Sequence, residues 1–312
     1  MATAEPTRVL LSVSSFGAGG DQDRRKLEDA GMEVLDNPHG RRLTRDEIGE
    51  LIGDVHALVA GTEPLDLPVL EQASRLRVIS RVGVGLENVD LNAARSLGIV
   101  VRNTPDAVTD PVAELTLAGM LSLLRHIGEM DRALRAGSWE RKMGGLLRGK
   151  TVGIVGLGRI GRRLTELLAP FEVTVLASDR APDQRVAGEL GATYVELDEL
   201  LERSDIVTLH VPGMTRPLIG ADELARMQPH ALLVNASRGG LVDEDALLAA
   251  LHEGRLAGAY VDTFVDEPYT GPLTELEQVL VTPHAGSYAR EARARMESEA
   301  VDNLLGALEE FR

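Results

Sequence analysis

The stretch TVGIVGLGRIG, residues 151–161, decides the fold. An apolar, β-branched run leads into a G-x-G-x-x-G pattern, and the helical pattern Ile160–Leu168 follows it directly. In that setting one glycine allows a tight turn, one lets the backbone approach a pyrophosphate, and one lets helix and strand pack closely. The amides at the helix start present the positive end of the helix dipole to the pyrophosphate. The candidate cofactor residues of this turn are Gly156, Gly158, Arg159, Ile160 and Gly161.

A carboxylate follows the next predicted strand, Val173–Ser178. Asp179 can accept hydrogen bonds from the ribose hydroxyls of an adenosine and would repel a 2′-phosphate. The neighbouring Arg180 acts in the opposite sense, because an Arg can pair with such a phosphate. On balance the pattern predicts NAD rather than NADP.

Short β-branched runs alternate with helical patterns along the whole chain, as in parallel sheets with crossover helices. We therefore expect an α/β protein with two parallel-sheet domains, Rossmann-like or flavodoxin-like. The first set of strands is predicted at Val9–Val13, Glu33–Leu35, Ala57–Ala60, Val78–Ile79 and Ile99–Val101. The second set is predicted in TVGIVG, VTVLAS, TYV, IVTLHV, ALLVNAS, GAYVDTF and VLVTPH.

Two long helices stand outside this alternation. Pro111–Ile127 reads as a helix capped by Asp110, with proline at its first position, and its place between the two α/β patterns suggests that it bridges the domains. Glu291–Glu310 reads as a closing helix that packs back on the first domain.

Composition excludes several classes of protein. With 312 residues the chain has room for two domains, and its formal net charge of −16 argues against nucleic acid or anionic membranes as partners. It has no Cys, so disulfides, thiolate catalysis and Cys-based metal sites are excluded, and we expect no metal site. No apolar run is long enough to span a membrane. We expect a cytoplasmic protein.

Three polar residues follow strands of the second set, at the sheet edge where ligands of open α/β sheets bind. Arg238 lies in NASRGG, Glu267 in VDEP, and His284 in TPHAG. Singly, each is more often a solvated loop residue, a turn or a satisfied structural group. Together they suit oxidation of a 2-hydroxy acid: a guanidinium can clamp a carboxylate and polarise a carbonyl, and a His with a carboxylate partner can move a proton.

Ordered motifs over about Arg81–Leu308 make the chain resemble the D-isomer-specific 2-hydroxyacid dehydrogenases, most closely members like D-3-phosphoglycerate dehydrogenase. The motifs are RVGVGLENVDL, NTP, VAELT, SWERK, GKTVGIVGLGRIG, NASRGGLVDEDALLAAL, DTFVDEP and TPHAGS.

The resemblance implies roles for individual residues. Arg238 would bind and polarise the substrate, His284 would be the general acid/base, and Glu267 would pair with His284. Asp262 would face the nicotinamide carboxamide, and Asp179 would hold the adenosine ribose. Further residues would line the cofactor: Arg159, Ile160, His210, Pro212, Ala236 and Gly286.

The resemblance also implies a domain plan. Residues 1–102 and 286–312 would form a substrate domain, and residues 103–285 an inserted NAD-binding Rossmann domain, with the active site in the cleft between them. The loop Val82–Leu86 would present the amides of Val84 and Gly85 to the substrate carboxylate. Members of the family are commonly homodimers joined through the cofactor domain, so we expect the same here.

The choice of acid depends on Arg81, which lies beside this glycine loop. If Arg81 faces the substrate, the acid has a second anionic group, such as a phosphate, phosphonate or carboxylate; a simple hydrophobic 2-keto acid is the alternative. Other residues have no assigned role: Arg102, Arg141, Lys142, Tyr288 and Arg290.

Two other functions stay open. Non-catalytic NAD(H)-sensing corepressors share this fold and can keep Arg, Glu and His. A dehydrogenase of a small inorganic anion, such as phosphite, is the second. Turnover of a panel of 2-keto acids separates both from the main hypothesis.

Overall fold

The computed structural model describes residues 6–14, 16–17 and 20–311, which form two units. The first unit combines Met1–Val108 with Ser287–Arg312, and the second is Thr109–Gly286. The predicted domain boundaries, at residues 102/103 and 285/286, stay a prediction. In the first unit the Thr104 hydroxyl accepts a hydrogen bond from the Gly83 amide at 2.7 Å.

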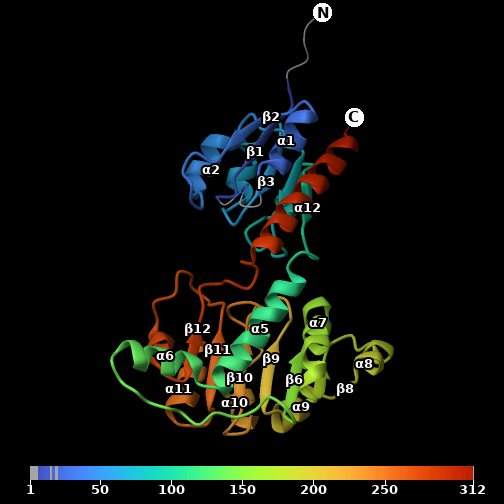
Figure 1. Ribbon diagram of the computed structural model, residues 1–312. Coiled ribbons are helices and arrows are strands. Elements are labelled where there is room, and N and C mark those ends of the chain that lie inside the picture. Colours follow the sequence, from blue (N-terminus) through green and yellow to red (C-terminus); the bar gives the residue numbers. More distant parts are fainter. Residues whose placement is uncertain (1–5, 15, 18–19, 312) are drawn as a thin grey trace, which may run out of the picture. The chain divides into compact units, whose positions relative to one another are not determined.

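The first unit is built on five parallel strands in the order β2-β1-β3-β4-β5 (Figure 1). This is the doubly wound arrangement, in which successive strands are added on one side of β1 and then, from β3 on, on its other side. The strands are β1 (Arg8–Leu11), β2 (Glu33–Asp36), β3 (Ala57–Ala60), β4 (Val78–Arg81) and β5 (Val100–Asn103). The helices are α1 (Gln22–Asp29), α2 (Arg45–Ile52), α3 (Leu67–Leu70), α4 (Leu91–Ser96) and α12 (Arg290–Glu309).

The closing helix α12 packs on β3, β4 and β5 of the first unit, as the sequence predicted. It buries an apolar face that includes Met296 and Leu304, and the Ser80 hydroxyl of β4 donates a hydrogen bond to the carbonyl of Ala300 at 2.7 Å. A helix from the end of the chain therefore completes the core of the first sheet.

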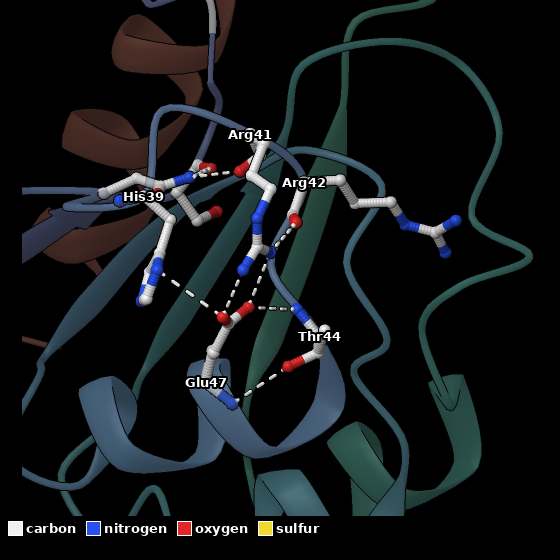
Figure 2. Close-up of polar contacts among 7 residues, drawn as sticks. His39, Arg41, Arg42, Thr44 and Glu47 are labelled. Carbon is white, nitrogen blue, oxygen red and sulfur yellow. Dashed lines mark hydrogen bonds and ion pairs between the residues drawn. The ribbon is translucent and has the colours of Figure 1, made fainter.

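Helix α2 of the same unit begins with a capping box (Figure 2). The Thr44 hydroxyl accepts from the Glu47 amide, and the Glu47 carboxylate accepts from the Thr44 amide at 2.8 Å. Two guanidinium nitrogens of Arg41 donate hydrogen bonds to the same carboxylate, at 2.6 and 2.9 Å. These hydrogen bonds lower the pKa of Glu47 to about 2.

The second unit is built on seven parallel strands in the order β12-β11-β10-β9-β6-β7-β8 (Figure 1). The strands are β6 (Thr151–Val155), β7 (Thr174–Ser178), β8 (Ala192–Tyr194), β9 (Ile206–Leu209), β10 (Leu232–Asn235), β11 (Gly258–Val261) and β12 (Val279–Val281). The α-helices are α5 (Thr109–Leu124), α6 (Ile127–Arg135), α7 (Arg159–Leu168), α8 (Gln184–Leu190), α9 (Leu197–Arg203), α10 (Ala221–Arg226) and α11 (Glu244–His252). Two short 3₁₀ helices are η1 (Ala169–Phe171) and η2 (Pro272–Glu275). The predicted class, two parallel-sheet α/β domains, is confirmed.

The helix predicted at Pro111–Ile127 is present, but its predicted ends were wrong; its suggested role as a bridge between domains stays a prediction. Helix α5 starts at Thr109, ends at Leu124, and packs on α7, β10, β11 and β12, so it is a core helix of the second unit. His126 takes φ = 52°, in the left-handed region, and a new helix, α6, begins at Ile127.

Within the described part of the chain, every helix is too short or too polar to cross a bilayer.

Candidate functional site

The glycine-rich turn lies between β6 and α7, and each glycine has a distinct environment. Gly156 has φ = 95°, and a Cβ there would lie 2.5 Å from the carbonyl oxygen of His210. A Cβ on Gly161 would lie 2.2 Å from the carbonyl oxygen of Gly156. A Cβ on Gly158 would meet no atom within 4 Å. Thus the first and third glycines allow close packing, and the second borders open space.

Helix α7 begins directly at this open glycine. Gly158 is the N-cap, and no side chain caps the helix there. The amides of the first helical residues, Arg159 and Ile160, belong to the group that an α-helix leaves without intrahelical acceptors. A ten-residue helix with such a start attracts an anion.

Asp179 follows β7 and is bonded to the same turn. One oxygen accepts from the Leu157 amide at 2.9 Å, and the other accepts from the Ala181 amide at 3.0 Å. A carboxylate has about four acceptor positions, so Asp179 can hold the turn and still bind two ribose hydroxyls.

His210 lies just past β9, against Gly156. Its Nε2 is 3.0 Å from the Thr208 hydroxyl. Its buried Nδ1 has no hydrogen-bond partner in the described part of the chain. Burial lowers the pKa of His210 to about 4, so the ring is neutral at pH 7. An unpartnered ring nitrogen, an acceptor at Asp179 and open backbone at Gly158 together fit a dinucleotide. Two further candidates lie nearby in sequence: Pro212, which is exposed, and Ala236, which is buried after β10.

The structure brings Glu267 and His284 into direct contact. Glu267 lies in the loop after β11, and His284 lies just past β12. The Nδ1 of His284 is 2.9 and 3.1 Å from the two carboxylate oxygens. The Phe264 amide also anchors Glu267, since it donates to the carboxylate at 3.1 Å. Because the carboxylate faces Nδ1, the other ring nitrogen, Nε2, is directed away from this pair and can exchange a proton with a substrate.

Arg238 lies in the loop after β10, beside the loop that carries Glu267. A Cβ on Gly239 would lie 1.8 Å from the carbonyl oxygen of Phe264, so only glycine lets the two loops pack this closely. The Arg238 Nη1 donates to the carbonyl of Ser237 at 2.8 Å, and its own carbonyl accepts from Asn235 at 2.9 Å. Three candidate residues thus follow β10, β11 and β12 at one edge of one sheet.

Asp262 is fully buried at the end of β11 and bonds to the segment after His284. It accepts from the Ala285 amide at 2.7 Å and from the Gly286 amide at 2.9 Å. It also accepts from the Thr282 hydroxyl. Oδ2 has one further acceptor position, which a carboxamide N–H could use. The contact between Asp262 and the nicotinamide carboxamide stays a prediction.

The predicted substrate residues Arg81, Val84 and Gly85 lie at and after the end of β4, in the first unit. The Arg81 guanidinium packs on the backbone of Gly83, which has φ = 134°; a Cβ there would lie 1.4 Å from Nη1. Nη1 also donates to the Val82 carbonyl at 2.5 Å. The Val84 carbonyl accepts from Asn103 at 2.8 Å.

The residues without a predicted role lie on the surface. Arg102 pairs with Glu310 at 3.5 Å, and Lys142 pairs with Glu129 and Glu277. Arg141 and Arg290 are exposed. Tyr288 is 70% exposed, and the guanidinium of Arg293 lies 5.4 Å from its ring centre.

Sequence reasoning missed several polar residues inside the two units. In the first unit Glu297 is almost fully buried, accepts from the Gly17 amide at 2.9 Å and faces Arg293; burial raises the pKa of Glu297. In the second unit the hydroxyls of Tyr260 and Thr282 lie 2.9 Å apart, next to Asp262. Local spacing carries no signal for Thr282, because the strand β12 ends at Val281 and the backbone at His284 is left-handed rather than extended.

Comparisons with known proteins identify the family. Residues 117–286 match the family model described as "D-isomer specific 2-hydroxyacid dehydrogenase, NAD binding domain". The chain is 42% identical to a glyoxylate reductase of Aeropyrum pernix, over 78% of this chain and 77% of that protein. It is also 42% identical to a D-3-phosphoglycerate dehydrogenase of Methanocaldococcus jannaschii, over 80% of this chain but only 49% of that protein.

Among solved structures, the TT0316 protein of Thermus thermophilus has a TM-score of 0.88 and 35% identity, with 97% of each chain covered. The family model covers more than half of the chain, and it describes an NAD-binding domain that lies within the second unit. The chain therefore belongs to the NAD-dependent D-isomer-specific 2-hydroxyacid dehydrogenases.

Proposed function

We propose that this enzyme interconverts a small 2-keto acid and its D-2-hydroxy acid, with His284 as general acid/base, Glu267 as its partner and Arg238 as the substrate-binding cation. The contact between His284 and Glu267 carries the proposal. It leaves Nε2 as the nitrogen that can exchange a proton with a substrate, at the sheet edge that also carries Arg238.

In the direction of reduction, NADH supplies the hydride for C2 of the keto acid. Protonated His284 gives the Nε2 proton to the carbonyl oxygen as that oxygen gains charge, and the products are the 2-hydroxy acid and NAD⁺. Glu267 stabilises the imidazolium and fixes the ring orientation. The planar guanidinium of Arg238 binds the carboxylate and polarises the carbonyl.

For the cofactor we propose that Gly158 and the first amides of α7 receive the pyrophosphate and that Asp179 receives the adenosine ribose. His210, Pro212, Ala236, Asp262 and Gly286 complete the proposed set of residues. The open side of Gly158 and the remaining acceptor positions of Asp179 support this assignment.

The finer proposal is that the acid carries a second anionic group, recognised by Arg81. Glyoxylate has a single carboxylate, whereas phosphoglycerate has a carboxylate and a phosphate. A relative named glyoxylate reductase and one named D-3-phosphoglycerate dehydrogenase are both 42% identical to this chain. Arg81→Ala is then expected to raise the KM for a phosphorylated keto acid far more than the KM for glyoxylate. Equal increases would contradict this finer proposal.

We further propose a homodimer joined through the second unit. Helix α6 buries none of its residues, and the segment after it exposes Trp139, Met143 and Leu146 by 82, 95 and 69%. A monomer seldom exposes so many large apolar side chains on one short segment, and a second copy is the occupant we propose. Sedimentation should give a dimer mass that falls to that of a monomer in Met143→Glu; a wild-type monomer would refute the proposal.

The test of the function is NADH oxidation with glyoxylate, pyruvate, hydroxypyruvate and 3-phosphohydroxypyruvate, with phosphite and NAD as a separate arm. We expect turnover of at least one keto acid, and a loss of about a hundredfold or more in His284→Ala, within the range for a general acid. His252→Ala, an exposed His at the end of α11, is the matched control and should keep full activity. Turnover of phosphite alone, or of no acid at all, would overturn the substrate class. Full activity of His284→Ala would overturn the role of His284.

A further inference from the structure

The backbone of His284 has an unusual conformation. Its φ is 51°, in the left-handed region, which only a few per cent of non-glycine residues adopt, His, Asn and Asp more often than others. Such conformations persist only where the surrounding contacts impose them, and they gather at functional sites. The question is which contacts impose this one.

Asp262 supplies most of these contacts. Its carbonyl accepts from the His284 amide at 2.8 Å, and its carboxylate accepts from the amides of Ala285 and Gly286. Three consecutive amides, including that of His284 itself, are therefore bonded to one buried residue. This arrangement fixes the backbone on both sides of the His284 side chain.

Two hydroxyl groups hold Asp262 in turn. The Thr282 hydroxyl donates to Asp262 Oδ1, so its oxygen must accept from its other neighbour, the Tyr260 hydroxyl at 2.9 Å. The hydrogen bonds thus run in one direction, from Tyr260 through Thr282 to Asp262. Burial raises the pKa of Tyr260, which keeps it a donor at neutral pH.

Packing fixes the start of this chain of hydrogen bonds. Tyr260 is 1% exposed, and its ring lies directly on the backbone of α5, where a Cβ on Gly119 would come within 2.1 Å of a ring carbon. The Tyr260 hydroxyl therefore cannot shift without moving a core helix.

We propose that Tyr260 and Thr282 are positioning residues, which act through Asp262 to hold His284 in its left-handed conformation and its imidazole against Glu267. The expected effect on kcat rests on the proposed function, since it assumes that His284 transfers the proton. The expected effect on the backbone around His284 does not rest on the proposed function.

The decisive variant is Thr282→Val, which keeps the branched shape and removes the hydroxyl. We expect kcat to fall about ten- to a hundredfold, the order of loss for a catalytic group displaced by a fraction of an ångström to one ångström. The KM for the keto acid and the dissociation constant of NADH should change much less than kcat. Thr282→Ser should restore most of kcat, and Tyr260→Phe should show a smaller loss of the same kind.

Thr263→Val is the matched control. Thr263 directly follows Asp262 in sequence, is almost fully buried, and its hydroxyl has no hydrogen-bond partner in the described part of the chain. This variant should keep wild-type kinetics. If Thr282→Val is as active as Thr263→Val, or if Thr282→Ser fails to restore kcat, the positioning role is wrong.

A second measurement needs no turnover. Hydrogen exchange of a peptide that contains Ala285 and Gly286 should be faster in Thr282→Val than in the wild type and unchanged in Thr263→Val. Equal exchange rates in all three proteins would overturn the proposal. If the wild type turns over no keto acid, only the proposed function is wrong, because the exchange rates still test whether Thr282 holds the backbone around His284.

Discussion

At the scale of single residues, Asp179 is the clearest case of a side chain with two tasks. It holds the glycine turn through the Leu157 amide, and in the proposed cofactor site its charge would disfavour a phosphate on the ribose. Asp179→Asn keeps one acceptor oxygen but removes the charge. We expect the ratio of kcat/KM for NADPH over NADH to rise about ten- to a hundredfold, since a charge repulsion of a few kcal/mol is removed.

As a control for Asp179→Asn, a second variant should change a neighbouring charge and leave the hydrogen bonds of the glycine turn intact. Arg180→Gln is suitable, because Arg180 is exposed and adjacent in sequence. Arg180→Gln removes a cation that can pair with a phosphate, so the ratio should stay at the wild-type value or fall, and should not rise as in Asp179→Asn. An unchanged ratio in Asp179→Asn would mean that Asp179 only stabilises the turn.

The place of a residue in the fold could be predicted where its side chain follows a strand, but not where a contact depends on strand register. Arg238, Glu267 and His284 could be found because the carboxyl ends of parallel strands lie at one edge. The Thr282–Asp262 contact depends on β11 and β12 pairing Val261 with Val281, which places residues 262 and 282 side by side. This register cannot be predicted from the local sequence pattern.

At the scale of elements, the cap of α2 gives a pH-dependent contribution to stability (Figure 2). The contacts of Glu47 lower its pKa to about 2 from an ordinary value near 4.5. A carboxyl with a lowered folded-state pKa contributes stability above its unfolded-state pKa, and this contribution is lost as pH falls from about 4.5 toward 2.

Glu47→Gln should therefore be less stable than the wild type at pH 7, by urea unfolding, and the difference should shrink at pH values below the ordinary pKa of a glutamate. Glu50→Gln, on the same helix, is the control; for Glu50 the described part of the chain gives no hydrogen bond or ion pair, so its substitution should have little effect. A difference between wild type and Glu47→Gln that stays constant from neutral pH into this acidic range would exclude this linkage.

The break between α5 and α6 shows what limits prediction of elements. Nothing local marks it, since no Pro or Gly stands at residues 125 and 126. The carbonyl of Leu124 instead accepts from the amide of Gly145 at 2.8 Å, and Gly144 packs on the same carbonyl so closely that a Cβ there would lie 2.4 Å away. A segment about twenty residues further on satisfies the helix end, and a reading of local pattern cannot detect that.

At the scale of the whole molecule, the order of motifs along the chain predicted the fold class, the cofactor and the family together. The glycine turn, its carboxylate and the three residues after β10, β11 and β12 all lie on one parallel sheet of the second unit. The acid itself could not be predicted in the same way, because it depends on the side chains around the substrate rather than on the backbone plan.

The most direct test of the central claim follows the hydrogen atom. The enzyme is incubated with NADH that carries two deuterium atoms at C4 of the nicotinamide and with pyruvate, hydroxypyruvate or 3-phosphohydroxypyruvate, whichever it turns over fastest. Glyoxylate is left out because its product, glycolate, is achiral. The product is analysed by mass spectrometry and on a chiral column. We predict one deuterium at C2 of a D-2-hydroxy acid, in an amount equal to the NADH oxidised, and almost none over the same time in His284→Ala. An L-product, or NADH oxidation without deuterium at C2, would contradict the account.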